Sequence, residues 1–223
     1  MHPLLRRMAP MAMPPKFKPV RRRFGARPFR MLDIGAGNHS ATRTLAWFPE
    51  CTYTGVDRDR TYHNDPADFA RMAAFHEVDL TTLAFDAIPD AAFDVIMMAH
   101  VVEHLPNADA VVRALTPKLA PGGIFVLEFP SPRSLTLPSM RGTLNFHDDD
   151  THVRLWTLAE IGAALEAGGL RVIASGRRRD LFRIVVTPVR VLWSFLRHGW
   201  VPGSAFWDLL GFADAIVAER PRA

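Results

Sequence analysis

Three aspartates follow short apolar runs at points where their carboxylates could bind a polar ligand. They are Asp33 in LDIGAG, Asp57 in TGVD and Asp79 in EVDL, and Asp57 stands 24 residues beyond Asp33. Gly35 and Gly37 let the chain turn sharply after the first aspartate and let a ligand approach the backbone. A carboxylate in the second position can accept hydrogen bonds from both hydroxyls of a ribose, and one in the third can accept from the amino group of an adenine. If the three runs are adjacent parallel strands, the aspartates form a nucleoside site.

Four histidines in the second half of the chain could exchange a proton near neutral pH: His100, His104, His147 and His152. The last two flank three consecutive aspartates, residues 148–150, so this stretch could bind a metal, form an acid–base cluster or be a solvated loop. A metal requires ligands that converge from fixed positions, whereas three adjacent carboxylates point in different directions. We therefore expect no metal site here.

Seven apolar runs alternate with segments of helical periodicity, and most of them are apolar on both faces, as are parallel strands that helices cover. Thr157 and Glu160 have the spacing of a capping box for a helix that ends at Gly168. The pattern predicts an α/β fold with a doubly wound, mostly parallel, seven-stranded Rossmann-like sheet and helices on both faces. The predicted strands are residues 30–34, 52–57, 73–79, 93–98, 122–129, 170–176 and 213–220.

Basic residues gather near the N-terminus. The whole chain carries a net charge of +4 and residues 1–32 alone carry +9, so the remainder carries −5. Prolines and methionines are frequent in the same region, so we predict a flexible basic arm over residues 1–28 and one folded domain over residues 29–223. The arm either binds an anionic partner, such as a nucleic acid, a lipid headgroup or a phosphorylated substrate, or is a solvated tail.

A long segment between the last two predicted strands, about residues 181–212, departs from the alternating pattern. It is rich in aromatic and aliphatic residues, and Arg183, Arg190 and Arg197 interrupt it at seven-residue intervals. Those charges and two prolines argue against a transmembrane helix, and Pro188 is expected to begin a new helix. We expect a helical insertion that covers a hydrophobic acceptor, contacts a membrane surface, or packs on the sheet or in a homodimer interface.

The glycine motif distinguishes two classes of nucleotide. A dinucleotide site needs a third glycine in GxGxxG, and Ser40 occupies that position here, so a ligand without a pyrophosphate is favoured. Over about residues 30–175 the chain resembles the class I S-adenosylmethionine-dependent methyltransferases, in particular the group with the ubiquinone-biosynthesis O-methyltransferase type of motif. The resemblance depends on LDIGAG, GVD, EVDL, FDVIMMAHVVEHLPN and LAPGGIFVLEFPSP, which match in order and spacing.

The resemblance implies S-adenosylmethionine as the cofactor. The implied contacts are Asp33, Gly35 and Gly37 with its methionine end, Asp57 with the ribose, Asp79 and Leu80 with the adenine, and Ala99 and His100 near the sulfonium. The tyrosine or proline pair of base and amide N-methyltransferases is replaced by MAHVV after the fourth predicted strand. This replacement favours an oxygen or small-molecule acceptor.

The resemblance also places the histidine and aspartate stretch. A His-x-Arg-x-Trp-Thr pattern that often stands here in the group is matched by His152, Arg154, Trp156 and Thr157. We expect this stretch to be a lid on the acceptor side, with His152 as the favoured general base and Asp150 as a residue that could orient it. His100 and His104 are the other candidates for the base. His104 could instead cap and pack at a helix start. His152 could instead only tie the lid to the sheet.

These features favour a methyltransferase that acts on a hydroxyl of a small molecule, a lipid-linked intermediate or a glycan. Two alternatives remain: an RNA methyltransferase whose basic arm holds phosphates, which we consider less favoured, and a non-catalytic cofactor-binding partner subunit. The single cysteine, Cys51, excludes an intramolecular disulfide framework. We therefore expect a reducing, cytoplasmic location, with peripheral membrane contact and a homodimer as further options.

Overall fold

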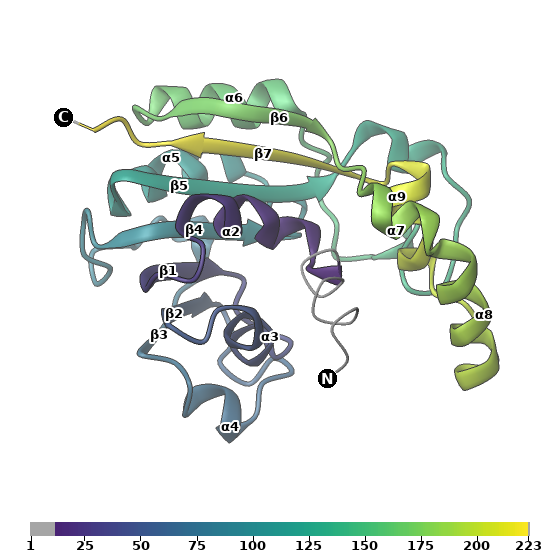
Figure 1. The fold of residues 1–223 in the computed structure, drawn as a ribbon. Helices are drawn as coiled ribbons and strands as arrows, with labels where there is room; N and C mark the ends of the chain where they lie inside the picture. Colours follow the sequence, from purple (N-terminus) through teal and green to yellow (C-terminus); the bar gives the residue numbers. More distant parts are fainter. Residues whose placement is uncertain (1–11, 223) are drawn as a thin grey trace.

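The structure, a computed structural model, describes residues 12–222. Its strands form one sheet in the order β3-β2-β1-β4-β5-β7-β6, and all neighbours are parallel except β7, which runs antiparallel to β5 and β6 (Figure 1). The prediction of a mostly parallel seven-stranded sheet is confirmed. The strands are β1 (Phe29–Ile34), β2 (Cys51–Asp57), β3 (Ala74–Glu77), β4 (Phe93–Ala99), β5 (Leu119–Pro130), β6 (Arg171–Arg177) and β7 (Ala213–Glu219).

Helices follow most of the strands, and short 3-10 helices, labelled η, occur in the connections. The α-helices are α2 (Lys18–Phe24), α3 (Ser40–Trp47), α4 (Pro66–Phe69), α5 (Ala108–Leu115), α6 (Leu158–Ala167), α7 (Leu181–Val185), α8 (Thr187–His198) and α9 (Trp207–Leu210). The 3-10 helices are η1 (Pro15–Phe17), η2 (Leu80–Thr82), η3 (Val102–His104), η4 (Thr116–Lys118), η5 (Pro132–Thr136), η6 (Phe146–Asp148) and η7 (Gly203–Phe206).

Side chains of the central strands alternate between two cores, one on each face of the sheet. Met31 and Met97 pack with residues of α2 and α3, whereas Leu32 and Ile96 pack with residues of α5 and α6. All four side chains are fully buried or nearly so. The parallel strands are therefore covered on both faces, which is why their sequences are apolar almost throughout.

Local signals in the sequence set two of the helix boundaries. The Thr157 hydroxyl accepts the backbone N–H of Glu160, and the Glu160 carboxylate accepts the backbone N–H of Thr157, so the predicted capping box begins α6. Pro188 lies in the first turn of α8, where its missing N–H costs no helical hydrogen bond. Both predicted boundaries are confirmed.

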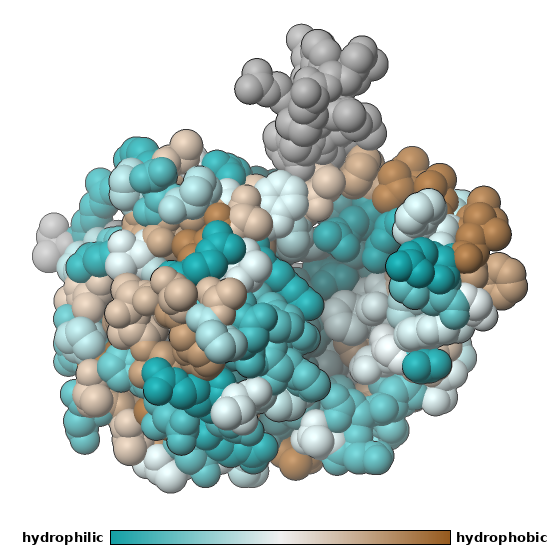
Figure 2. Space-filling model, turned by 90° about the horizontal axis from the view of Figure 1, so that it is seen from below, coloured by the Kyte–Doolittle hydropathy of each residue, from teal (hydrophilic) through white to brown (hydrophobic). Residues whose placement is uncertain are grey.

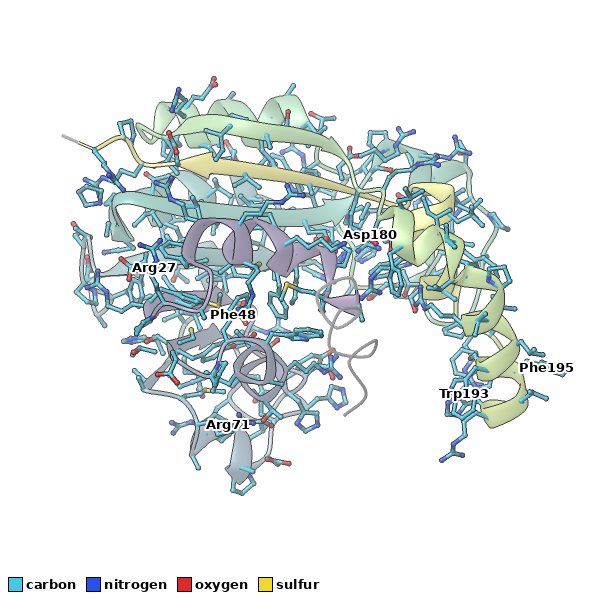
Figure 3. The ribbon with its side chains drawn as sticks, viewed as in Figure 1. Arg27, Phe48, Arg71, Asp180, Trp193 and Phe195 are labelled. Carbon is cyan, nitrogen blue, oxygen red and sulfur yellow. The ribbon has the colours of Figure 1, made fainter. Side chains whose placement is uncertain are left out.

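The prediction of a flexible arm over residues 1–28 is wrong for the described part, residues 12–28. Phe17 and Val20 are 2% and 0% exposed, and they pack with Phe48 beneath α2, as Figure 3 shows for Phe48. Arg21 and Arg23 donate hydrogen bonds to backbone carbonyl groups of the domain. The apolar residues between the arginines bury enough surface to order the segment. The prediction was based on net charge and did not take them into account. Residues 1–11 lie outside the described part.

The segment between β6 and β7 consists of α7, α8, η7 and α9, and α8 extends away from the sheet (Figure 1). An ion pair between Lys18 on α2 and Asp180, which caps α7, joins this segment to the N-terminal helix. Among the described helices, none has the length and apolar character needed to cross a bilayer.

The burial of the N-terminal helix gives a stability prediction. Phe17→Ala should lower the free energy of unfolding by about 3–5 kcal/mol, because it leaves a cavity between α2 and the sheet. Arg22→Ala, at an exposed position of the adjoining helix α2, is the control and should change it by less than about 0.5 kcal/mol. Urea unfolding followed by circular dichroism measures both, and equal midpoints would show that α2 does not contribute to the core.

Candidate active site

The candidate site lies where β1, β2 and β4 end together. Ile34 of β1 pairs with Val56 of β2 on one side and with Met98 of β4 on the other, so the residues that follow these strands share one edge. From β1 the chain passes to β2 on one side, and the connection after β3 returns to β4 on the other side of β1. This is the topological switch point, where ligands bind in open α/β sheets.

A tight turn after β1 is possible only with glycine. Gly35 has φ of +79°, and a Cβ atom on it would lie 2.4 Å from Cγ2 of Val101. A Cβ atom on Gly37 would lie 2.6 Å from the Tyr62 ring, because the loop after β2 folds over the turn. The backbone N–H of Asn38 donates to the Tyr62 carbonyl at 3.0 Å, which holds this loop in place. The turn therefore presents bare backbone at the edge of the sheet.

Asp33 is a buried carboxylate beneath this turn. It is 3% exposed and accepts a hydrogen bond of 2.6 Å from the Tyr53 hydroxyl. Burial raises the pKa of Asp33 to about 6, although the positive charge of Lys16 and the Tyr53 hydrogen bond oppose the shift. A nearby cationic ligand group would stabilise the charged form of Asp33, because it would replace the solvation that burial removes.

Asp57 and Asp79 are oriented by backbone groups. The two carboxylate oxygens of Asp57 accept the N–H groups of Gly37 at 3.0 Å and Arg58 at 2.7 Å. Asp79 caps η2 and accepts both the N–H and the hydroxyl of Thr81, which lowers the pKa of its carboxyl group. Asp79 is exposed and Asp57 is partly exposed, whereas Leu80 packs in the core. Both carboxylates keep acceptor capacity for hydroxyl or amino groups of a ligand.

His100 occupies the first position after β4 in the left-handed region, with φ of +58°. Its Nδ1 lies 3.1 Å from Glu103 and its Nε2 lies 3.2 Å from Glu128. Although burial lowers it, these two carboxylates raise the pKa of His100 to about 9. Both ring nitrogens therefore donate near neutral pH, and the charged ring cannot accept another proton.

The chain of charges continues beyond His100. Arg178, after β6, donates to Glu128 at 2.6 Å and makes a bidentate pair with Asp208 of α9. Glu103, Glu128 and Asp208 are each at most 5% exposed. We call the series Glu103–His100–Glu128–Arg178–Asp208 the buried ionic chain. It joins η3, the end of β4, β5 and the helical segment.

His104, the last residue of η3, lies beside His152, and the centroids of the two rings are 4.9 Å apart. Nδ1 of His152 donates to the Phe146 carbonyl at 2.6 Å, so its Nε2 carries the lone pair when the ring is neutral. One ligand atom each of Glu103, His104 and His152 lies within 4.8 Å of the others, and Oε2 of Glu103 is buried without a hydrogen-bond partner. This group could hold a divalent ion, in a place that the sequence analysis did not expect.

The three consecutive aspartates act separately, as their divergent directions predicted. Asp148 accepts bonds from Ser139 and from three backbone N–H groups. These bonds outweigh partial burial and lower the pKa of Asp148 to about 2. Asp149 accepts the N–H and hydroxyl of Thr151, and Asp150 is exposed. Asp148 and Asp149 therefore stabilise the loop through separate hydrogen-bond partners.

A cavity of about 280 Å³ opens beside the end of β4. Figure 2 shows the molecule hollowed between its main body and the helical segment, with hydrophilic residues in the hollow. The lining includes Ala99 and His100 but neither His104 nor His152. The full lining consists of Pro14, Pro15, Lys16, Ala99, His100, Glu128, Arg178, Arg183, Arg190, Ser204 and Trp207.

Comparisons with known proteins agree with this geometry. A family model described as a methyltransferase domain matches residues 4–175. The ubiquinone biosynthesis O-methyltransferase of Methylobacterium nodulans is 29% identical over 96% of this chain and 88% of its own length. The 27-O-demethylrifamycin SV methyltransferase of Amycolatopsis mediterranei is 31% identical over 50% of this chain and 44% of its own length.

The chain belongs to the class I S-adenosylmethionine-dependent methyltransferases.

Solved structures support the fold of this methyltransferase. A SAM-dependent methyltransferase from Archaeoglobus fulgidus has a TM-score of 0.61 at 18% identity, covering 98% of this chain and all of the other. Haemonchus contortus phosphoethanolamine N-methyltransferase 2, in complex with S-adenosyl-L-methionine, has a TM-score of 0.62 at 17% identity, covering 93% of this chain and 52% of the other. The cofactor of the methyltransferase is S-adenosylmethionine.

The residues at the edge of the sheet fit this cofactor. The turn after β1 exposes backbone, and carboxylates stand at the carboxyl ends of β1 and β2 and just after β3, the kind of place where a nucleoside's ammonium, hydroxyl and amino groups can be bound. Sequence reasoning missed Tyr53, Lys16 and Glu128 in this region. Glu128 was visible as a lone acid inside an apolar strand, whereas nothing marked Tyr53 or Lys16 as neighbours of Asp33.

Asp33 should make cofactor binding depend on pH. A ligand ammonium favours the carboxylate, so protonation of Asp33 as the pH falls through about 6 should weaken S-adenosylhomocysteine binding, by about tenfold between pH 7 and pH 5. Asp33→Asn should bind more weakly and lose this dependence. Titration calorimetry at several pH values tests it, and a dependence that persists in Asp33→Asn would exclude Asp33 as its source.

Proposed function

We propose that the methyltransferase methylates a hydroxyl of a small molecule that enters the cavity beside His100. The observation that carries this proposal is the position of the cavity, which meets the cofactor edge at Ala99 and His100. Its volume of about 280 Å³ suits a small acceptor or the head of a lipid-linked or glycan acceptor. One of the relatives described above is named an O-methyltransferase, and the other is named for a 27-O-demethylated substrate. Both names support oxygen as the accepting atom.

The chemistry asks little of the protein beyond positioning and one proton transfer. S-adenosylmethionine supplies an electrophilic methyl group and a neutral leaving thioether, so no general acid is needed. The hydroxyl of the acceptor must lose its proton to a base within reach, directly or through a water. His100 is charged near neutral pH and does not meet this requirement. His152, whose Nε2 carries the lone pair when the ring is neutral, is the favoured base, and His104 beside it is the alternative. Neither ring lines the cavity, so we propose that the proton reaches the base through a water.

The RNA methyltransferase alternative loses support from the N-terminal helix. Arg21, Arg23 and Arg27 donate to backbone carbonyl groups within the domain. Cations occupied in this way contribute less to phosphate binding than free ones. The remaining alternative, a non-catalytic partner subunit, requires cofactor binding without turnover.

Replacement of the proposed base should separate chemistry from cofactor binding. His152→Gln should lower the methylation rate about 100-fold, while S-adenosylhomocysteine affinity stays within a few-fold, because His152 is proposed to act on the acceptor proton. His147→Gln, at an exposed position five residues earlier, is the control and should retain the rate. A His152→Gln enzyme with full activity would remove His152 from the mechanism. Loss of wild-type activity in chelator that returns with a divalent ion would assign His152, with Glu103 and His104, to a metal instead.

The outer face of the helical segment suits an interface with lipid. Leu181, Val185, Val189, Trp193 and Leu196 are each more than two-thirds exposed and recur every three or four residues. Figure 3 shows Trp193 and Phe195 projecting on opposite sides of the free end of α8. Residues 181–207 contain no acid, and exposed arginines stand in the sequence on either side of this stripe, Arg179 before it and Arg197 after it. An apolar stripe with basic flanks is typical of helices that lie on anionic membranes.

Vesicle co-sedimentation tests this peripheral contact. The protein should bind vesicles that contain anionic lipid, bind neutral vesicles less, and lose most of its binding in Trp193→Ala, because the indole inserts at the headgroup level. Ile173→Ala, an exposed apolar residue on β6, is the control. Binding that is equal on neutral vesicles and insensitive to Trp193→Ala would contradict a role for α8.

A further inference from the structure

Two arginines in the cavity lack a carboxylate partner within residues 12–222. Arg183 of α7 and Arg190 of α8 both line the cavity, and neither forms an ion pair with an acid of the described chain. Nε of Arg183 is buried without a hydrogen-bond partner, and Arg190 makes one long hydrogen bond, of 3.4 Å, to the Ala205 carbonyl. Residues 1–11 contain no aspartate or glutamate, so their side chains cannot supply the missing acid.

The carboxylates near these arginines already have closer partners. Glu128 and Asp208 bind Arg178 in the buried ionic chain, and Asp180 binds Lys18 and caps α7. Burial lowers the pKa of the Arg183 guanidinium, and the nearby charges of Arg190 and Arg178 lower it further, although Asp208 and Asp180 oppose the shift. Two cations that repel each other in a partly buried cavity are costly unless an anion joins them.

The two arginines are held toward the same cavity by the break between α7 and α8. The hydroxyl of Thr187, the first residue of α8, donates to the Arg183 carbonyl at 2.7 Å, and Pro188 lies in the first turn of α8. Ser194, one turn beyond Arg190, donates to the Trp200 carbonyl, which fixes α8 against the loop that follows. The arginines therefore come from two helices with defined positions and not from a mobile loop.

We propose that Arg183 and Arg190 bind an anionic group of the methyl acceptor, a carboxylate or a phosphate, so that the hydroxyl to be methylated faces the cofactor edge at His100. The planar guanidinium groups offer paired N–H donors that match either anion. His100 and Trp207, whose rings lie 4.7 Å apart, line the same cavity as the two arginines. The substrate class that this assigns is a hydroxylated small-molecule acid, and the assignment rests on the proposed function.

Binding of matched ligands tests the proposal without requiring turnover. In enzyme saturated with S-adenosylhomocysteine, 3-hydroxybenzoate should bind at least about tenfold more tightly than its neutral isostere 3-hydroxybenzamide, as measured by titration calorimetry. Arg183→Gln with Arg190→Gln should remove this preference and leave binding of the amide unchanged. Arg197→Gln, exposed on the same helix and outside the cavity lining, is the matched control and should retain the preference. Inorganic phosphate in competition separates a phosphate site from a carboxylate site.

The outcomes distinguish this proposal from the proposed function. The double variant should keep or raise the melting temperature, because it removes an uncompensated repulsion, so lost anion binding cannot be ascribed to unfolding. Equal affinity for acid and amide, no binding of either anion, or a preference that survives the double variant would overturn the anion site. Anion binding that depends on both arginines, in an enzyme that methylates no hydroxylated acid, would retain the site and overturn O-methylation.

Discussion

The buried ionic chain is the interaction on which the acceptor half of the molecule depends. Its five side chains come from η3, the end of β4, β5, the residue after β6, and α9, and its three acids are almost completely buried. Removing one member would leave a charge without its partner in a region of low dielectric, which costs several kcal/mol, on the order of 3–5. The chain therefore fixes the helical segment against the sheet and holds His100 in its left-handed conformation at the mouth of the cavity.

This arrangement divides the carboxyl edge of the sheet into two parts of opposite character. The part at β1, β2 and β3 carries carboxylates, at Asp33, Asp57 and Asp79, where we expect the cofactor to bind. The part beyond β4 carries cations, at Arg183 and Arg190, where we propose that the acceptor binds. Such a division orients two reactants that carry different charges, and orientation supplies much of the rate enhancement in a displacement that needs no acid catalyst.

The sequence was sufficient for the sheet because its strands depend on local patterns. Apolar runs that contain LDIGAG, GVD and EVDL predicted three strands, and Thr157 with Glu160 predicted the start of α6. The folding of residues 12–28 was missed because Phe17 and Val20 stand among six basic residues. The ionic chain could not be predicted, because Glu128 and Arg178 are 50 residues apart and pair only once β7 has placed β6 beyond β5. The roles of individual histidines likewise depended on partners brought together by the fold, such as Glu103 and Glu128 around His100.

A crystal structure of the protein with S-adenosylhomocysteine tests the central claim, that the cofactor edge and the acceptor cavity meet at His100. We predict that the ribose hydroxyls contact the Asp57 carboxylate and that the sulfur faces the cavity at Ala99 and His100. A ligand that leaves Asp57 without a ribose contact, or whose sulfur is separated from the cavity by the His100 ring, would contradict the account.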